Sequence, residues 1–408
     1  MLPTAADSGG WAAGNTIRET ARWTVRVLLC VVAGVLLSPL SGSVLTAKYI
    51  VSTSPLVVFS SLLATRSWEW ALAAGLAVTG IALVRRRWFC RWACPTGLCA
   101  DVASHLGTRC GRHRPRLPAV GFGLALLTLG GAVVGYPLFL WLDPLALLSN
   151  SFTAPHAASR TVALLCVVAV PLLVLICFLW PGIWCMRLCP LGAMQDLLAQ
   201  LARGARRSVS GADRDALRST LRVGRRAALV GGAGLAAGWL VIRRSEPSDS
   251  ALRPPGALPH GRFTGVCLRC GACVRACPAH IIVPDLGRHG VASFLSPTLA
   301  FHEDYCREDC VRCSEVCPSG AIGAVTPEAK AQTRIGLAQV TMDLCLLADD
   351  RECGVCRNHC PFAAIRIVFS PETYTLTVVV ATQRCPGCGA CEVVCPTAPV
   401  KAIRVVPN

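Results

Sequence analysis

Sixteen of the 25 cysteines lie between Cys267 and Cys395 in four groups of four, and so many thiols in so short a segment leave few possible folds. The first and fourth groups follow the spacing C-x2-C-x2-C-x3-C-P, in which three thiolates bind one [4Fe–4S] cluster and the fourth reaches a neighbouring cluster. The second and third groups have a longer gap after their first cysteine, which we interpret as a loop insertion. The spacing therefore predicts four [4Fe–4S] clusters with these iron ligands: Cys267, Cys270, Cys273, Cys277, Cys306, Cys310, Cys313, Cys317, Cys345, Cys353, Cys356, Cys360, Cys385, Cys388, Cys391 and Cys395.

Two other uses of cysteine fit these groups less well. Structural zinc prefers two separated Cys-x2-Cys pairs, often with histidine, and neighbouring cysteines of one triplet are poorly placed to form disulfides. Glycines such as Gly271 and Gly389 permit the positive φ that a loop around a cluster needs. Short β-prone runs, AIGAV, AIRIVFS and AIRVV, follow several Cys-Pro pairs and predict strands, with TYTLTVVV as a hairpin arm.

The N-terminal half has the composition of a membrane protein. Hydrophobic residues make up 53% of the chain, and a helix needs about 20 apolar residues to cross a hydrocarbon core of about 30 Å. We predict four spans, at Thr24–Leu45, Trp68–Val84, Pro118–Trp141 and Thr161–Trp180. Tryptophans at the ends of these stretches suit the membrane interface.

The net charge of +17 comes almost entirely from this apolar half. Residues 1–243 contain 24 Lys and Arg against 8 Asp and Glu, whereas residues 244–408 contain 16 against 15. Arginines gathered in the loops between spans indicate membrane orientation, and they argue against a nucleic-acid partner. The tail with Arg18, Arg22 and Arg26, the loop Arg85–Arg116 and the segment Arg187–Arg226 are therefore predicted to face the cytoplasm.

The apolar half contains an internal repeat with a period of about 90 residues. Each copy has a span, an outer segment (TSPLVVFSS from Thr53, LDPLALLSN from Leu142), a second span and a Cys-x3-Cys-Pro motif. Proline after the second cysteine suits a helix start, where backbone amides stabilise thiolate charge. Parallel copies would bring the motifs together on the cytoplasmic side, where four thiolates could close one further Fe–S cluster: Cys90, Cys94, Cys185 and Cys189. Zinc, or buried thiols without a ligand, are the alternatives.

Other features of the apolar half have plainer interpretations. Cys30, Cys166 and Cys177 lie inside predicted spans and are interpreted as packing residues. The outer segments around Pro55 and Pro144 are interpreted as interfacial helices, and a quinone pocket beside them is the less favoured alternative.

A fifth hydrophobic segment precedes the cysteine-rich region. Its apolar core, Ala227–Ile242, is short for a span, and the preceding Arg225–Arg226 pair is typical of a twin-arginine export signal. Export would place the following domain in the periplasm, whereas an amphipathic anchor, the alternative, would leave that domain in the cytoplasm. The stretch Ser245–His260 contains four prolines and predicts an extended spacer.

The sequence therefore predicts a membrane α-helical bundle followed by an α+β, ferredoxin-like polyferredoxin domain. The bundle has four spans plus a fifth, signal-like span. The predicted limits are a tail at 1–20, a four-span domain at 21–205, a basic segment with the signal-like span at 206–246, and the polyferredoxin domain at 247–408.

Both halves resemble known families at these motifs. Residues 20–205, with CRWACP and CMRLCPLGA after paired spans, resemble membrane proteins of the NapH/MauN type and the membrane part of NosR. Residues 218–408, with the twin-arginine pair and four cysteine groups, resemble polyferredoxins of the NapG/MauM type. The chain thus looks like a fusion of two proteins that are usually separate partners.

The resemblance implies a multi-pass protein of the bacterial inner membrane that acts in a quinol dehydrogenase-type system. It would pass electrons from the quinol pool to a periplasmic redox enzyme or cytochrome. The alternative is a factor that supplies electrons for the maturation of a periplasmic enzyme, or that regulates such an enzyme.

Several other redox cofactors are excluded by the sequence. The predicted spans contain no histidine, the chain has no C-x2-C-H motif, and no G-x-G-x-x-G opens a nucleotide-binding unit. Electrons would therefore enter and leave through clusters, quinone or a partner. Cytoplasmic Cys-x3-Cys-Pro motifs and periplasmic clusters would nevertheless face each other across about 30 Å of hydrocarbon with no carrier between them.

Overall fold

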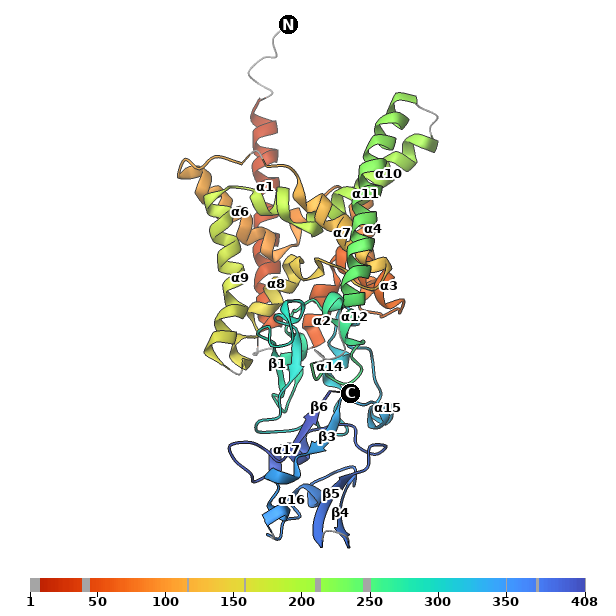
Figure 1. Cartoon of the computed structure of the whole chain (residues 1–408). Coiled ribbons are helices and arrows are strands. Elements are labelled where there is room, and N and C mark those ends of the chain that lie inside the picture. The colour runs from red at the N-terminus through yellow and green to blue at the C-terminus, as the bar shows by residue number, and fades with distance from the viewer. Residues whose placement is uncertain are drawn as a thin grey trace.

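The computed structural model describes residues 8–38, 45–115, 117–157, 159–209, 214–244, 251–349, 351–371 and 374–407. The predictions that concern Arg116, Pro247 and the first seven residues fall outside these ranges. The chain forms a helical part and, below it in Figure 1, an elongated C-terminal part of loops, short helices and two-stranded sheets.

The helical part combines long apolar helices with short helices that begin at proline. In chain order its α-helices are α1 (Ser8–Leu37), α2 (Leu45–Ser52), α3 (Pro55–Thr65), α4 (Leu72–Val84), α5 (Trp88–Trp92), α6 (Pro95–Arg109), α7 (Val120–Val133), α8 (Pro144–Ser151), α9 (Arg160–Leu179), α10 (Pro190–Val209) and α11 (Arg214–Arg244). Shorter turns lie at η2 (Leu140–Leu142), η3 (Ala154–His156) and η4 (Trp184–Leu188). Residues 8–20, predicted as a tail, belong to α1.

The order of these helices follows the predicted repeat. Proline begins α3 and α8, an apolar helix follows each, and proline begins α6 and α10 directly after the second cysteine of each Cys-x3-Cys-Pro motif. Ser54 and Asp143 cap α3 and α8, and the Ser54 hydroxyl donates to Asp143 Oδ2 at 2.5 Å. Both residues are fully buried. The prediction of interfacial helices is therefore wrong, because the capping groups bond to each other inside the bundle and do not face water.

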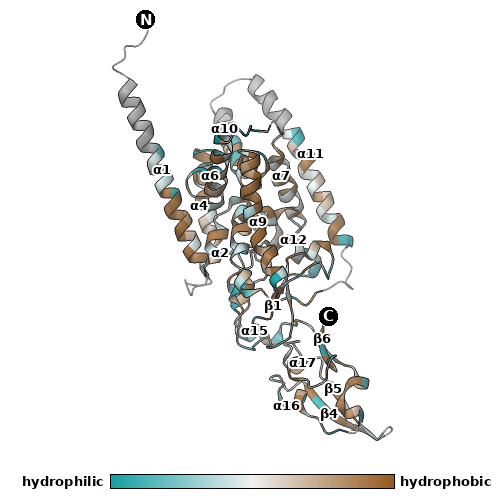
Figure 2. Cartoon of the chain, turned by 90° about the vertical axis from the view of Figure 1, so that its left-hand side faces the viewer, coloured by the Kyte–Doolittle hydropathy of each residue, from teal (hydrophilic) through white to brown (hydrophobic). Residues whose placement is uncertain are grey.

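The described residues include three helices that are long and apolar enough to cross a membrane: Glu19–Leu37 of α1, the whole of α9, and Gly224–Arg244 of α11. Helices α2 and α3 qualify only as a pair bent by 96°. The second and third predicted spans contain α4 and α7, of 13 and 14 residues, each about 20 Å long at 1.5 Å per residue. Apolar residues concentrate on α1, α4, α9 and α11 (Figure 2).

Helix α11 is a packed member of the bundle. It extends well beyond the predicted apolar core and lies along α7 (Figure 1). A Cβ at Gly234 would overlap the backbone of Leu127, and one at Gly238 would lie 3.1 Å from the Cα of Gly131. Small residues let membrane helices approach this closely. Helix α11 therefore joins the two parts of the molecule as a packed helix.

The change Gly234→Leu is expected to loosen α11 from α7. Overpacking of this kind costs about 1–3 kcal/mol, and here the obstacle is backbone. The midpoint of unfolding in a detergent titration should fall. Gly232→Leu is the matched control, because a Cβ at Gly232 meets no atom of the described residues within 4 Å. Equal midpoints for the two variants would contradict the packing role of Gly234.

The C-terminal part contains three two-stranded antiparallel sheets among its described residues. Strand β1 (Ile282–Pro284) pairs with β2 (Pro297–Leu299), β3 (Leu337–Val340) with β6 (Ile403–Val406), and β4 (Ile365–Ser370) with β5 (Thr375–Val380). The short helices are α12 (His260–Val266), α13 (Ala272–Ala276), α14 (Arg312–Glu315), α15 (Pro327–Gln332), α16 (Val355–Asn358) and α17 (Ala390–Val394).

Most of the predicted strands are present. The hairpin of AIRIVFS and TYTLTVVV is confirmed as β4 and β5, and AIRVV forms β6. The strand predicted at AIGAV is wrong, because only Ile322 makes a bridge, to Ala257. The backbone N–H of Ile322 instead points to the sulfur of Cys317 at 3.4 Å.

The predicted spacer is wrong for its described residues, 251–260. Ala251 and Arg253 are buried, and the carbonyl oxygen of Leu252 accepts from the backbone N–H of Leu299 at 2.9 Å. The Arg253 guanidinium donates to Ser296 Oγ and to the carbonyl oxygen of Pro297. These bonds build the segment into the C-terminal part, so the packed domain begins before its first cysteine.

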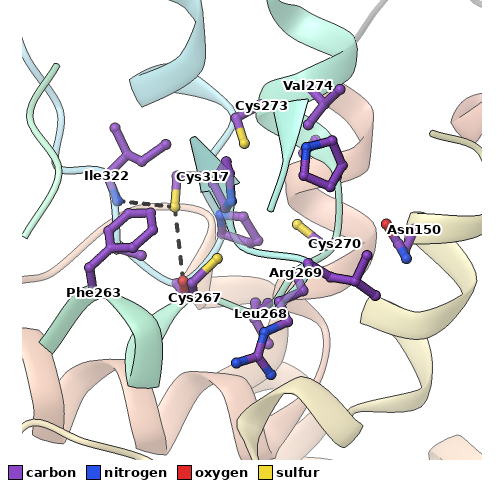
Figure 3. A pocket seen from close by; sticks show the side chains of 18 residues that line it. Asn150, Phe263, Cys267, Leu268, Arg269, Cys270, Cys273, Val274, Cys317 and Ile322 are labelled. Carbon is purple, nitrogen blue, oxygen red and sulfur yellow. Dashed lines mark hydrogen bonds between the residues drawn. The ribbon is translucent and has the colours of Figure 1, made fainter. Parts of the chain in front are cut away.

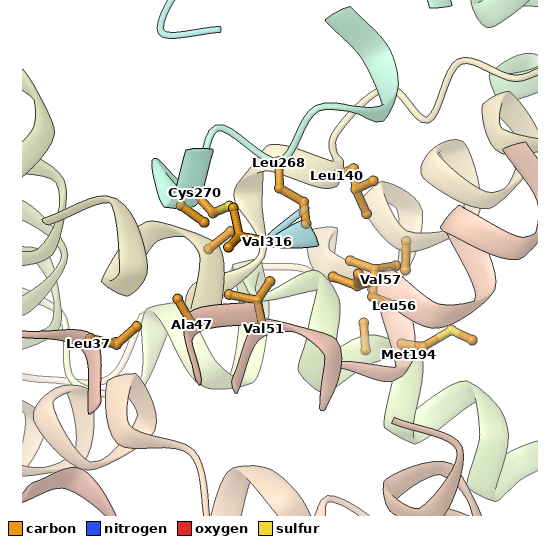
Figure 4. Close-up of a cluster of buried hydrophobic side chains, with 14 of the residues drawn as sticks. Leu37, Ala47, Val51, Leu56, Val57, Leu140, Met194, Leu268, Cys270 and Val316 are labelled. Carbon is orange, nitrogen blue, oxygen red and sulfur yellow. The ribbon is translucent and has the colours of Figure 1, made fainter. Parts of the chain in front are cut away.

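The two parts share one hydrophobic core (Figure 4). Leu268, Cys270 and Val316 of the C-terminal part pack against side chains of α1, α2, α3 and α10 and of the turn before α8, namely Leu37, Ala47, Val51, Leu56, Val57, Leu140 and Met194. Burying such a continuous apolar surface is the main force that holds the parts together.

Candidate cysteine sites and their links

The first two cysteine groups exchange their fourth members. Cys267, Cys270 and Cys273 line a pocket with Cys317 of the second group (Figure 3), which we call site 1. Site 2 is lined by Cys277 of the first group with the first three cysteines of the second group: Cys306, Cys310 and Cys313. This is the arrangement that the spacing predicts, in which the cysteine before proline completes the neighbouring site.

The third and fourth groups repeat this exchange. Site 3 consists of Cys345, Cys353 and Cys356 together with Cys395 of the fourth group, all lining one pocket. At site 4, Cys360 of the third group is an electrostatic neighbour of Cys388 and Cys391, and Cys385 is their fourth member. Among the described residues, no three His, Cys, Asp or Glu side chains converge on the position of a single ion.

Backbone geometry places the thiols around each pocket. Gly271 and Gly389 adopt φ of 69° and 88°, as predicted, and each stands at the start of the short helix that carries the third cysteine of its group. A residue that follows a Cys-Pro pair donates its backbone N–H to the cysteine sulfur, as Ala364 does to Cys360 Sγ at 3.3 Å. Such N–H···S bonds stabilise negative charge on a ligand sulfur.

The electrostatics of these sites suit a group that carries positive metal charge. Burial raises the pKa of Cys270 to about 12 and that of Cys388 to about 11. Free thiols would therefore stay protonated at neutral pH, and thiolates would need iron beside them. Four cysteines around an apolar pocket match the donor set of a [4Fe–4S] cluster, a group that accepts and donates single electrons.

Site 2 and site 4 lie next to each other, although their main ligand groups are far apart in sequence. The backbone N–H of Cys306 donates to the carbonyl oxygen of Cys388 at 2.9 Å. Because site 1 shares its loops with site 2, and site 3 shares its loops with site 4, the spatial order is 1, 2, 4, 3. Site 1 lies against the helical part and site 3 lies toward the far end (Figure 1).

The Cys-x3-Cys-Pro motifs also come together. Cys90, Cys94 and Cys189 belong to one cluster of packed side chains. Cys185 is an electrostatic neighbour of all three. We call this group the membrane site. Its cysteines lie on α5, at the start of α6, on η4 and at the start of α10.

The start of α6 has the predicted form. Cys94 is its N-cap residue, Pro95 follows, and Cys94 Sγ accepts from the Gly97 backbone N–H at 3.3 Å.

Polar side chains around the membrane site were not foreseen from the sequence. Gln195 donates to Cys90 Sγ at 3.1 Å. Arg87 donates to the carbonyl oxygen of Cys185 at 3.0 Å, and Asp196 binds both Arg87 and Arg86. Gln195 and Asp196 follow Pro190 by one to two helical turns, a position at which side chains point back toward the helix start. This spacing is the signal that could have identified them.

The cysteines predicted as packing residues lie on the long apolar helices α1 and α9. Cys30 is on α1, and Cys166 and Cys177 are buried on α9. Cys166 and Cys177 belong to none of the five groups of four.

Comparisons with known proteins agree with this arrangement. A family model described as "4Fe-4S dicluster domain" matches residues 266–321, the segment of sites 1 and 2. A second model, "4Fe-4S binding domain", matches residues 57–113 and 161–208, one match in each repeat of the helical part. No solved structure matches the chain.

Relatives match the C-terminal part. The methylamine utilization ferredoxin-type protein MauM of Methylorubrum extorquens is 33% identical over 182 residues, which cover 43% of this chain and 81% of MauM. The ferredoxin-type protein NapG of Escherichia coli is 34% identical over 173 residues, 40% of this chain and 73% of NapG.

Fold, cysteine sites and matches define an iron–sulfur electron-transfer protein of the ferredoxin type with several apolar helices. The chain belongs to the family of ferredoxin-type proteins that includes MauM and NapG.

Proposed function

We propose that the chain carries electrons from the quinol pool of the bacterial inner membrane to a redox partner in the periplasm. The clusters would be four of the [4Fe–4S] type at sites 1 to 4 and one further Fe–S cluster at the membrane site. The observation that carries the proposal is the continuous series of cysteine sites from the interior of the apolar helices to the far end of the C-terminal part.

The charge distribution supports the orientation. The described basic segments at the N-terminal side of α1 and around α5 and α6 lie at the end of the bundle opposite the C-terminal part (Figure 1). Cytoplasmic arginines would place that part in the periplasm, in agreement with the twin-arginine pair at Arg225–Arg226.

Site 3 is the natural exit. Cys345, Cys353 and Cys356 are partly exposed, whereas Cys267 and Cys270 of site 1 are buried. Beside site 3, the β4–β5 hairpin exposes Phe369 and Tyr374. Cys306 and Cys310 of site 2 and Cys360 of site 4 are partly exposed as well, and site 3 is favoured because it lies toward the far end of the C-terminal part, beside these exposed aromatic side chains.

The proposal predicts that a water-soluble quinol added to membranes will bleach the cluster absorbance. The same preparation should contain about twenty iron atoms per chain, four for each of five clusters. Clusters that dithionite reduces but quinol does not would contradict the quinol source. Reduction by quinol without continued turnover, together with an immature periplasmic enzyme when the chain is absent, would favour the maturation role.

A further inference from the structure

Helix α8 connects the membrane site to site 1. Its eight residues follow Asp143, and Leu145 and Ala146 in its first turn are fully buried. Leu145 belongs to the cluster that contains Cys94 and Cys189. Thr96, two residues after Cys94, donates to the carbonyl oxygen of Pro144 at 2.9 Å. The N-terminal end of α8 therefore lies against the membrane site.

The opposite end of α8 holds the loop of site 1. Ser149 Oγ donates to the carbonyl oxygen of Cys270 at 2.9 Å. Arg275 Nη1 donates to the carbonyl oxygen of Ser149 at 2.6 Å and to Thr153 Oγ1 at 3.0 Å, and its Nη2 donates to Ser149 Oγ at 2.9 Å. These bonds join residues more than 120 positions apart in the chain.

We propose that α8 is the electron path between the membrane site and site 1, and that Arg275 is the positioning residue that holds site 1 against it. The inference rests on the proposed function, because it takes both sites to hold clusters. One electron would pass from a cluster held by the membrane-site cysteines to a cluster held by the cysteines of site 1, so that the first would be oxidised by one unit as the second is reduced by one unit. No atom or proton moves in this step.

The length of α8 makes the path short. Eight residues at 1.5 Å per residue span about 12 Å, against about 30 Å for a hydrocarbon core. The membrane site is therefore not separated from site 1 by a whole bilayer. The loop of site 1 packs into the helical part, and the distance from this loop to the membrane site is about the length of α8. Electron tunnelling falls steeply with distance, so a short packed helix can replace a mobile carrier.

The start of α8 is fixed as firmly as its end. Asp143 Oδ1 accepts from the backbone N–H groups of Leu145 and Ala146. Asp143 Oδ2 accepts from Ser54, the cap of α3 in the other repeat. Residues of both repeats thus hydrogen-bond at the first turn of α8. Buried side chains whose hydrogen bonds are satisfied keep a single conformation.

Arg275 is suited to a positioning role. Its side chain is buried, and among the described residues no carboxylate lies within 4 Å of it. A buried cation without a partner is costly. Thiolates at site 1 would supply negative charge beside it, since Cys270 and Cys273 are its electrostatic neighbours, together with Cys166 of α9. The planar fork of arginine can bond α8 in several directions while its charge faces the cluster.

Gly271 provides the sharpest test, because a Cβ there would overlap Thr153 beside the end of α8. Gly271→Ala should push site 1 away from α8 without removing a cysteine. The double variant Gly271→Ala, Thr153→Gly should allow close docking again and keeps the same strain at a positive φ. It loses the bond from Arg275 to Thr153 Oγ1, but the three bonds that join Ser149 to Cys270 and Arg275 remain. The single and double variants at Gly271 should both retain full iron content.

The readout is the EPR spectrum of protein reduced by dithionite. In the unchanged protein, the site 1 signal should be broadened by the reduced membrane-site cluster, and this broadening should vanish in Cys94→Ala, which lacks that cluster. We expect the broadening to be lost in Gly271→Ala and restored in the double variant. Broadening that persists in Gly271→Ala, or that is absent from the unchanged protein, would overturn the inference.

Substitutions of Arg275 test the positioning role separately. Arg275→Gln should reduce the broadening and lower the potential of site 1, whereas Arg275→Lys should reduce the broadening but largely keep the potential. Arg269→Gln is the control, because Arg269 is in the same loop but donates to the carbonyl oxygen of Ala292 and lies over Trp141. It should shift the potential and keep the broadening. If Arg275→Lys has the same EPR broadening and the same site 1 reduction potential as the unchanged protein, Arg275 does not position the loop.

These measurements do not depend on quinol. Broadening that follows the expected pattern in protein that quinol cannot reduce would leave the α8 path in place and reject the quinol source. Quinol reduction of site 1 without any broadening would reject the α8 path and leave the quinol source in place.

Discussion

Replacing Cys317 with alanine is expected to destroy the cluster at site 1 and to leave the cluster at site 2, although Cys317 follows the three main ligands of site 2 in the sequence. The reason is the exchange of fourth cysteines, since Cys317 lines the pocket of Cys267, Cys270 and Cys273. Among the described residues, the lining of this pocket offers no fifth thiol to replace the lost ligand. Iron content should fall by about four atoms per chain.

Alkylation of free thiols, mapped by mass spectrometry, identifies the lost cluster. In Cys317→Ala the three remaining cysteines of site 1 should become reactive, while Cys306, Cys310 and Cys313 of site 2 stay protected. Cys277→Ala is the reciprocal variant and should give the opposite pattern, because Cys277 lies at site 2. Reactive Cys306, Cys310 and Cys313 in Cys317→Ala would show that each group holds its own cluster, and the proposed pairing would then be wrong.

That the fourth cysteine of a group leaves for a neighbouring cluster could be predicted, because it is a local property, whereas which groups pair could not. Three cysteines within about seven residues wrap one pocket, and the chain direction after the third carries the fourth to a neighbour. The positive φ at Gly271 and Gly389 follows from the same tight loop. Spacing does not predict how the pair of sites 1 and 2 is placed relative to the pair of sites 3 and 4. The hydrogen bond between Cys306 and Cys388 that joins the two pairs connects segments with no shared sequence pattern.

The outer segments show where hydropathy misleads. LDPLALLSN has the composition of an interfacial helix, yet Asp143 and Ser149 are fully buried. Their burial depends on partners far away in the chain, Ser54 for Asp143 and Cys270 and Arg275 for Ser149. A pattern within one segment carries no information about such bonds.

Cys94→Ala and Cys189→Ala are each expected to remove the membrane-site cluster and to abolish reduction by quinol. Both thiols are buried against Leu145 and Leu191, and each stands at the start of a proline-headed helix. Iron should fall from about twenty to about sixteen atoms per chain. Sites 1 to 4 should still be reduced by dithionite, because none of their cysteines has changed.

Cys177→Ala is the matched control for this pair of variants. Cys177 is equally buried and lies close by on α9, in the packed cluster that Cys185 also contacts. It belongs to no group of four, so iron content and reduction by quinol should both remain at the level of the unchanged protein. Zinc in place of iron at the membrane site, or unchanged quinol reduction in Cys94→Ala, would show that electrons reach site 1 by another route. Loss of quinol reduction in both cysteine variants, with dithionite reduction intact, would identify the membrane site as the entry point of the chain of clusters.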